Sequence, residues 1–386
     1  MFSERTIWKA IVVKSTLSML GLQQIIGQES AIAALRSALK TAKLPGAYLL
    51  TGTAGTGRSF VATALAQAAM CLEPTSEPFD ACGVCASCKL FLSGTHPDIT
   101  HISAVGEKIQ IWQLWDRDGK PPGILSRTLR YSPTVGAKRV YILHDVEKFT
   151  PSAANSILKV LEEPPSYVMF ILLAMDSART LPTITSRCTQ IRLSTVSQSQ
   201  LEEYLQGNLS LTASDAAIIA AYSEGRIGQA VQMANNPNVM REINEVLAFS
   251  LSAASAPLGA ALKVAEQMRK LAGQMKATVQ LDVPDAAEEG EGSTKERAAR
   301  FQFTALFELL MLFYRDLLML SATAGNCKIA HPAHRTEMIS LSQRGGPFRW
   351  QACLEAILIA QRRLEANASI SLITEVLSMS LLECPE

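Results

Sequence analysis

The sequence predicts an α/β domain with a mostly parallel sheet followed by a helical region, and two observations support this fold class. Short apolar segments alternate with amphipathic helices from residue 21 to about residue 193. The expected strands are 47–50, 140–143, 168–173 and 190–193. After Ser197 the strand patterns give way to Ala- and Leu-rich segments with helical spacing. The chain therefore changes from α/β to helical near its middle.

The length of 386 residues is enough for two or three domains. We expect an N-terminal extension at 1–20, an α/β domain at 21–194, a small helical lid at 195–240 and a larger helical domain at 241–386. Residues 276–300 combine acidic residues with Gly, Ser and Pro and have few large apolar side chains, which predicts a flexible insertion. The apolar run from Phe303 to Leu320 contains charged residues, so it predicts a buried helix and not a membrane span.

The composition limits the possible functions. Apolar residues make up 48% and charged residues 18%, a balance that can bury a core and argues against global disorder. The formal net charge is only +1, so nucleic-acid contact has to be local or shared with partners. Four of the eight cysteines crowd between positions 71 and 88, which favours a metal site over disulfides and indicates the cytoplasm.

A glycine-rich loop, GTAGTGRS at residues 52–59, follows the first expected strand and precedes a helix. It matches the phosphate-binding pattern G-x-x-x-x-G-K-[ST], except that arginine replaces lysine. The expected nucleotide-site residues are Gly52, Gly55, Gly57, Arg58 and Ser59, with Ser59 as a possible magnesium ligand. Because a guanidinium does not place its charge where an ammonium does, two interpretations stay open: a loop that binds ATP with magnesium, and a remnant that only preserves the turn.

The strand at 140–143 ends in His144-Asp145-Val146-Glu147, where a Walker B site places a magnesium-binding acid followed by a catalytic base. His144 stands at the position of the acid, and Asp145, shorter than glutamate by one methylene, stands at that of the base. A shift by one residue would make Asp145 the metal-binding acid, but Val146 would then replace the base. Either alignment predicts poor ATP hydrolysis.

Four cysteines follow the helix of the phosphate loop with the spacing C-x10-C-x2-C-x2-C. We expect Cys71, Cys82, Cys85 and Cys88 to hold a structural zinc ion in a knuckle at 71–88. Four thiolates close a tetrahedral shell without a place for water, so the zinc has no catalytic role. His96 is a further possible ligand, but we expect it to serve a local turn or packing role because four cysteines suffice.

Arg187 lies in Ser186-Arg187-Cys188, just before the last expected strand. The pattern alone makes it an ordinary surface residue. An arginine at a domain edge can, however, reach the γ-phosphate bound by a neighbouring subunit.

Several stretches together resemble the AAA+ clamp-loader subunits of bacterial DNA polymerase III, the gamma/tau and delta-prime proteins. In chain order these stretches are Ile26-Gly27-Gln28-Glu29, residues 47–50, the four cysteines, Thr95-His96-Pro97-Asp98, residues 153–165 and Ser186-Arg187-Cys188. The resemblance is strong over residues 21–193 and fainter beyond them. It implies an AAA+ module and a C-terminal helical collar that packs with other subunits. The apolar stripe Leu372, Ile373, Val376 and Leu377 suits such packing, although an intramolecular core would look the same.

The departures from the family pattern resemble those of delta-prime. ATP-hydrolysing members carry G-S-x-R-D-A in the lid, and here Gly228 stands where their nucleotide-sensing arginine stands. Arg226 lies two residues earlier and would face another direction on a helix, so the sensor role is not transferred to it. The ATP site is thus altered in its phosphate loop, at both Walker B positions and in its sensor, while Arg187 is present.

The resemblance therefore implies a stator in a ring with gamma/tau-type and delta-type subunits. Arg187 would act in trans on a neighbour's ATP, supported by the turn at Ser186 and Cys188, while the ring opens the sliding clamp on primer-template DNA. The chain would be a component of the DNA polymerase III holoenzyme with weak or absent ATPase activity of its own. The alternatives are a gamma/tau-type motor and a zinc-containing nucleic-acid adaptor, and the second is disfavoured because Lys89 is the only positive residue from Cys71 to Lys89, against three acids.

Overall fold

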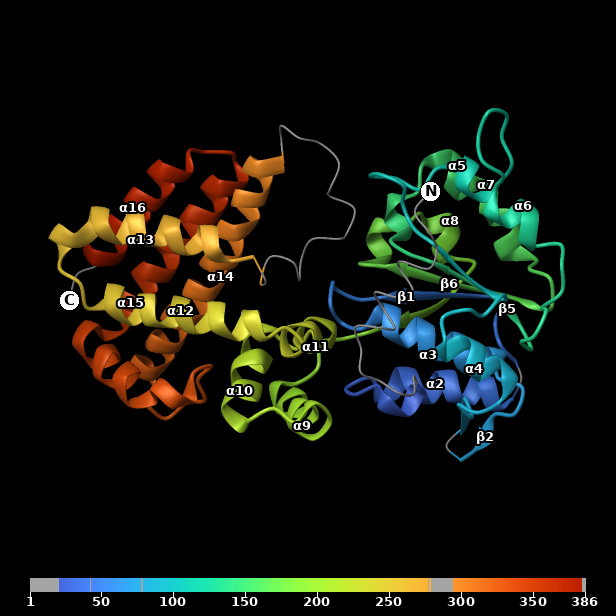
Figure 1. Cartoon of the computed structure of the whole chain (residues 1–386), viewed down its shortest axis with the longest axis horizontal. Helices are drawn as coiled ribbons and strands as arrows, with labels where there is room; N and C mark the ends of the chain where they lie inside the picture. The colour runs from blue at the N-terminus through green and yellow to red at the C-terminus, as the bar shows by residue number, and fades with distance from the viewer. Residues whose placement is uncertain (1–20, 42, 78, 277, 279–293, 384–386) are drawn as a thin grey trace. The chain divides into compact units, whose positions relative to one another are not determined.

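The structure is a computed structural model that describes residues 21–41, 43–77, 79–276, 278 and 294–383. The chain divides into two compact units (Figure 1). The first extends to Gln200 and includes Arg226–Gly228, and the second comprises Leu201–Gly225 and the chain from Gln229 onward. The expected extension at 1–20 lies outside the described residues, and the expected boundary between lid and collar stays a prediction.

The first unit is built on a five-stranded parallel sheet with strand order β4-β5-β6-β1-β7. Its strands are β1 (Ala47–Thr51), β4 (Ile99–Ile102), β5 (Arg139–Leu143), β6 (Val168–Ala174) and β7 (Thr189–Arg192). The predicted α/β class is confirmed, and the four expected strands are present to within one residue at each end. Strand β4 was not predicted, because it lies at the edge of the sheet and includes the polar Thr100 and His101 in its four residues.

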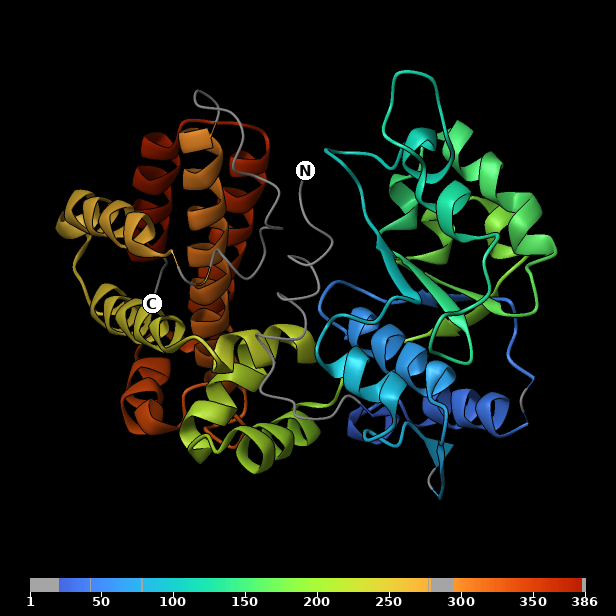
Figure 2. The same cartoon turned by 45° about the vertical axis from the view of Figure 1, so that its right-hand side comes forward.

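Helices cover both faces of this sheet, as Figures 1 and 2 show. The elements of the first unit besides the sheet are η1 (Leu22–Gln24), α2 (Glu29–Lys40), α3 (Arg58–Met70), the hairpin β2 (Thr75–Ser76) and β3 (Phe79–Asp80), α4 (Ala86–Leu92), α5 (Ile111–Leu114), α6 (Ile124–Thr128), η2 (Val146–Lys148), α7 (Pro151–Glu162), η3 (Ser177–Arg179) and α8 (Pro182–Thr185). Alternate residues of β1 face opposite cores: Tyr48 and Leu50 pack with α2 and α3, and Ala47 and Leu49 with α5 to α8.

Helix α7 shows how local sequence places a functional segment. The side chain of Thr150 caps its N-terminus by accepting a hydrogen bond from the N–H of Ala153 (3.3 Å), and Pro151 occupies the first turn. Ala154, Ile157, Leu158 and Leu161 have the spacing that predicts one buried helix face, and all of them are buried except Leu158, which is half-buried. The helix stops before Pro164, and its last residue, Glu162, is left at the surface.

The second unit is helical throughout its described residues. Its helices are α9 (Gln198–Leu209), which begins in the first unit, α10 (Ala213–Tyr222), α11 (Ile227–Ala234), α12 (Pro237–Ala254), η4 (Leu258–Ala260), α13 (Ala261–Gln274), α14 (Thr294–Ala322), η6 (Pro332–His334), α15 (Arg335–Glu365) and α16 (Ile370–Glu383). The expected buried helix at Phe303 to Leu320 forms part of α14, which packs along α15. In the described part of the chain, no helix combines the length and apolarity needed to cross a membrane.

The predicted flexible insertion at 276–300 is wrong at its C-terminal end. Residues 294–300 form the first turns of α14, because TKERAAR contains good helix formers that continue into the apolar run from Phe303. Arg300 also donates a hydrogen bond to the carbonyl oxygen of Leu364 (2.9 Å). Residues 279–293 lie outside the described residues.

A buried polar contact joins α10 to the segment before η6 within the second unit. The hydroxyl of Tyr222 and Nε2 of His331 are 3.1 Å apart, and the side chain of His331 is almost inaccessible. The nearby carboxylate of Asp316 accepts a hydrogen bond from the N–H of Ala330 (2.6 Å). Burial, together with the positive charges of His334 and Arg315, lowers the pKa of His331 to about 4.

Acidification is expected to destabilise the second unit through His331. Because the folded-state pKa lies below the ordinary value of about 6.5, the unfolded chain binds the proton first, and stability falls as the pH drops from about 6.5 to about 4. The loss from this residue is on the order of 3 kcal/mol. Urea unfolding of wild type and His331→Gln at several pH values in this range measures it, and equal losses in both chains would contradict the assignment.

Candidate functional site

The glycine-rich loop joins the end of β1 to the start of α3. The predicted residues Gly52, Gly55, Gly57, Arg58 and Ser59 all lie in this loop or the first turn of α3. The backbone φ of Gly55 is +82°, a conformation that favours glycine. Within the loop, the hydroxyl of Thr56 donates to the carbonyl oxygen of Thr53 (2.8 Å). The loop therefore keeps the compact strand-to-helix turn that cradles phosphates in this motif.

The segment Arg226–Gly228 lies directly against this loop in the first unit. The N–H of Gly228 donates to the carbonyl oxygen of Gly55 (2.8 Å), and a Cβ on Gly228 would lie 3.1 Å from that oxygen. A Cβ on Gly55 would in turn lie 3.0 Å from the Cβ of Arg226. Glycine at the sensor position thus permits a close backbone approach that an arginine side chain would disturb.

Arg58 is half-buried at the start of α3. Its Nη1 atom is buried and has no hydrogen-bond partner among the described residues. Burial lowers the pKa of Arg58, while the carboxylates of Asp145 and Glu147 act in the opposite direction. The guanidinium therefore lies within electrostatic reach of the end of β5, where a motor subunit would place its magnesium-binding acid.

A pair of histidines occupies that end of β5. Nδ1 of His101, on β4, and Nε2 of His144 are 3.1 Å apart, and the rings stack with centroids separated by 5.4 Å. Burial and the neighbouring His144 lower the pKa of His101 to about 3, and burial also lowers the pKa of His144. Both imidazoles are therefore neutral near pH 7. Neutral nitrogen ligands suit Mg²⁺ poorly, because this ion prefers oxygen donors.

Asp145, the candidate base, forms a surface ion pair with Lys148. Its backbone is left-handed, with φ of +49°, and its Oδ2 accepts from Nζ of Lys148 at 3.0 Å. Oε1 of Glu147 accepts a hydrogen bond from the N–H of Met175 (3.3 Å). The contact with Lys148 occupies one oxygen of the candidate base, and this adds to the effect of its shortening by one methylene.

Arg187 lies just after α8, whose Ile184 is fully buried and fixes this corner to the core. Nε of Arg187 donates to Oε1 of Glu162 at 2.7 Å, and Nη2 contacts the same oxygen. Nη1 donates to the carbonyl oxygen of Thr183 (2.9 Å) and lies 3.4 Å from Oγ of Ser186. The side chain remains 30% exposed.

The flanking residues support this turn in different ways. Oγ of Ser186 donates to the carbonyl oxygen of Thr183 (3.3 Å), which tightens the end of α8. Cys188 packs against the core of the first unit, and burial raises the pKa of its thiol to about 12. Cys188 is therefore an inert packing residue. Glu162 was not singled out from the sequence, because its contact with Arg187 spans 25 residues.

The four predicted cysteine ligands come together. All their sulfur atoms lie within 4.8 Å of one another, so the cluster could hold a metal ion. The separations Cys71–Cys82, Cys71–Cys85 and Cys82–Cys88 are 3.6, 3.9 and 4.0 Å. Tetrahedral zinc with Zn–S bonds of about 2.3 Å requires sulfur–sulfur distances of about 3.8 Å, so these residues fit zinc. Backbone N–H groups of Cys82, Cys85 and Cys88 also point at cluster sulfurs (3.3–3.4 Å), which favours thiolates.

His96 lies beside the cluster and outside it. The hydroxyl of Ser87 donates to the carbonyl oxygen of Met70 (2.8 Å), so Nε2 of His96 donates to that hydroxyl (2.9 Å). Nδ1 accepts from the N–H of Asp98 (3.1 Å). These contacts assign the neutral Nε2–H tautomer and give His96 the packing role expected from the sequence.

A phosphate loop at the end of β1 and a Walker B position at the end of β5, with β6 between the two strands, define a P-loop domain of the AAA+ class. Residues 27–197 match the family model for DNA polymerase III, delta subunit. The tau/gamma subunit of DNA polymerase III from Haemophilus influenzae is 34% identical over 184 residues, and the delta′ subunit from Bacillus subtilis is 34% identical over 174 residues.

These alignments cover 47% and 44% of this chain but only 25% and 49% of the two relatives, so the chain spans half or less of their length. A crystal structure of a gamma subunit-related protein from Thermotoga maritima covers 90% of this chain and 98% of that chain, at 17% identity and a TM-score of 0.41, too low to support an inference. The family match and the sequence relatives show that the α/β domain belongs to the AAA+ clamp-loader subunits of DNA polymerase III.

Proposed function

We propose that this chain is a delta-prime-type subunit of the DNA polymerase III clamp loader, a stator that supports ATP hydrolysis in a neighbouring subunit. The observation that carries the proposal is the neutral pair of His101 and His144 at the place where a motor needs a magnesium-binding acid. The close approach of Gly228 to the phosphate loop agrees with it, because glycine supplies no side chain at the sensor position. Arg226, two residues earlier, instead places its side-chain carbons against Gly55 of the loop. The stator role does not require this loop to hold ATP.

In this proposal Arg187 reaches the γ-phosphate of a neighbour's ATP. The turn after α8 is fixed to the core, and the guanidinium is partly exposed, as a residue that acts across an interface must be. Its Nε and Nη2 edge is paired with Glu162 in the isolated chain. Since that edge is also the fork that fits a phosphate, Arg187 would exchange Glu162 for the phosphate when the ring assembles. The exposed pair with Glu162 is a weak restraint, because such pairs contribute about 0–1 kcal/mol.

The second unit supplies a surface suited to a collar. Of the apolar stripe on α16, Ile373 and Leu377 are buried within the unit, whereas Leu372 is 61% exposed and Val376 is 36% exposed. The exposed half continues to Met379 one turn further on. We propose that this half packs against gamma/tau-type or delta-type subunits, and that contact with the sliding clamp and primer-template DNA is made through the assembled ring.

The cysteine cluster is proposed to hold a structural zinc ion. Cys71, Cys82, Cys85 and Cys88 supply four sulfur ligands and leave no position open for water, so bound zinc would crosslink the insertion without activating a substrate. Cys71 directly follows α3, which itself follows the phosphate loop. The knuckle is therefore anchored to the core of the AAA+ domain.

The rival interpretation is a gamma/tau-type motor. ATP hydrolysis by the Asp145→Asn variant distinguishes a motor from a stator. For a stator, any ATP hydrolysis by the purified chain with Mg²⁺ is expected to stay at the background rate and to be unchanged by the substitution, because Asp145 already pairs with Lys148 and no acid precedes it on β5. Phosphate release from both chains, compared with Asp215→Asn in the second unit as a matched control, measures this. Turnover that falls tenfold or more in Asp145→Asn alone would identify a motor.

A further inference from the structure

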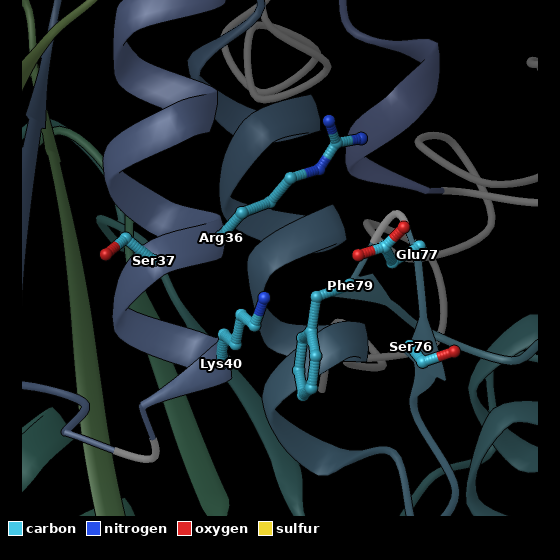
Figure 3. A pocket seen from close by; sticks show the side chains of 6 residues that line it. All are labelled: Arg36, Ser37, Lys40, Ser76, Glu77 and Phe79. Atoms are coloured by element: carbon cyan, nitrogen blue, oxygen red, sulfur yellow. The ribbon is translucent and has the colours of Figure 1, made fainter.

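A surface pocket lies between α2 and the β2–β3 hairpin that the cysteine knuckle carries (Figure 3). Its volume is about 510 Å³, within the range of small-molecule sites. The lining residues are Arg36, Ser37 and Lys40 from α2, and Ser76, Glu77 and Phe79 from the hairpin segment. No residue of the phosphate loop lines it, so it is separate from the candidate ATP site.

The α2 side of the pocket offers an oxyanion site. Arg36 and Lys40 are four residues apart on the helix and so share one face, and both side chains extend toward the hairpin in Figure 3. Nε and Nη2 of Arg36 are buried and have no hydrogen-bond partner among the described residues. These two atoms form the edge of a guanidinium that binds the two oxygens of a phosphate side by side.

The hairpin side adds an aromatic ring and an acceptor. Phe79 is half-buried, packs against the core beneath the hairpin and also borders the pocket. The exposed carboxylate of Glu77 can accept hydrogen bonds from a base amino group or a ribose hydroxyl. A phosphate joined to a planar base matches all of these groups, because bases stack on aromatic side chains.

We propose that this pocket binds a nucleoside phosphate, with the phosphate at Arg36 and Lys40 and the base on Phe79. The sequence of the knuckle disfavours nucleic acid because it has few basic residues. In the folded chain, however, the positive charges of Arg36 and Lys40 on α2 lie beside the aromatic side chain of Phe79 from the knuckle. The ligand is either a free nucleotide or one nucleotide of a single strand.

The test uses the purified full chain with three probes: a fluorescein-labelled oligoribocytidylate of about ten nucleotides, cytidine monophosphate and inorganic phosphate. Phe79→Leu is expected to weaken binding of the oligonucleotide and the monophosphate roughly five- to hundredfold and to leave inorganic phosphate unchanged. Phe79→Tyr, which keeps the ring, is expected to bind normally. Tighter binding of the oligonucleotide than of the monophosphate identifies a strand, and equal binding identifies a free nucleotide.

The roles of Arg36 and Lys40 are tested through the salt dependence of oligonucleotide binding. Arg36→Met and Lys40→Met are each expected to reduce the slope of log affinity against log salt for the oligonucleotide by about 0.7. Lys43→Met, a neighbouring lysine that does not line the pocket, is the matched control. The proposal is overturned if Phe79→Leu binds as wild type does, or if binding depends on Ser59 in the phosphate loop and not on these residues. Equal competition by polyglutamate would also overturn it, because simple charge attraction would then suffice.

Discussion

A clamp-loader ring assembled with Arg187→Ala is expected to hydrolyse ATP at least tenfold more slowly than a ring with the wild-type chain, in the presence of clamp and primer-template DNA. Arginine fingers contribute about 10³ to 10⁵ in rate, because the guanidinium stabilises the charge that develops on the transferred phosphoryl group. A tenfold loss corresponds to about 1.4 kcal/mol in the barrier and is therefore a conservative threshold. Steady-state phosphate release from the reconstituted ring measures it.

The matched control is Arg192→Ala, an exposed arginine on β7 only five residues further along the chain. Gel filtration must show that both variant rings assemble, since a lost subunit would also lower turnover. If the ring with Arg187→Ala is intact and turns over ATP as the wild type does, Arg187 is not a finger. The chain would then be a scaffold in the ring. The histidine pair at the end of β5 would account only for weak ATP hydrolysis by this chain.

Loss of the metal is expected to unfold the knuckle while the rest of the first unit stays folded. Structural zinc contributes on the order of 10 kcal/mol to the ordering of such elements. Leu72 and Val84 are exposed and Phe79 is half-buried, so apolar packing contributes little to holding this segment. The purified chain is expected to contain one zinc ion, and Cys85→Ser to lose it. Metal analysis by mass spectrometry and amide hydrogen exchange across residues 72–92 measure both effects.

Cys327→Ser is the control for this experiment, because Cys327 is also a free cysteine but lies in the second unit, outside the cluster. It is expected to retain the metal and the wild-type exchange pattern. A wild-type chain that carries no zinc, or a Cys85→Ser chain whose residues 72–92 exchange as slowly as in the wild type, would contradict the assignment. Because the knuckle carries Phe79, loss of zinc is also expected to weaken nucleotide binding in the proposed pocket.

The sequence by itself determined the α/β class, four strands of the sheet, the phosphate loop and the cysteine cluster. Each of these depends on local order: apolar periodicity sets strands and helices, and fixed spacing sets a loop or a ligand group. The altered ATP site also followed from sequence, because Arg58 departs from the phosphate-loop motif and His144 and Asp145 depart from the Walker B motif, and the positions of each motif are close together in the chain. The polar edge strand β4 escaped prediction, since only its pairing with β5 reveals it.

Only the tertiary structure decided which distant residues meet. His101 pairs with His144 because β4 and β5 are neighbours in the sheet, and Glu162 reaches Arg187 because α7 ends beside α8. Gly228 donates a hydrogen bond to Gly55 of the phosphate loop, although more than a hundred and fifty residues separate the two in the chain. No sequence spacing encodes such contacts, because they arise from how whole elements pack, and this packing determines where charges and donors are buried together.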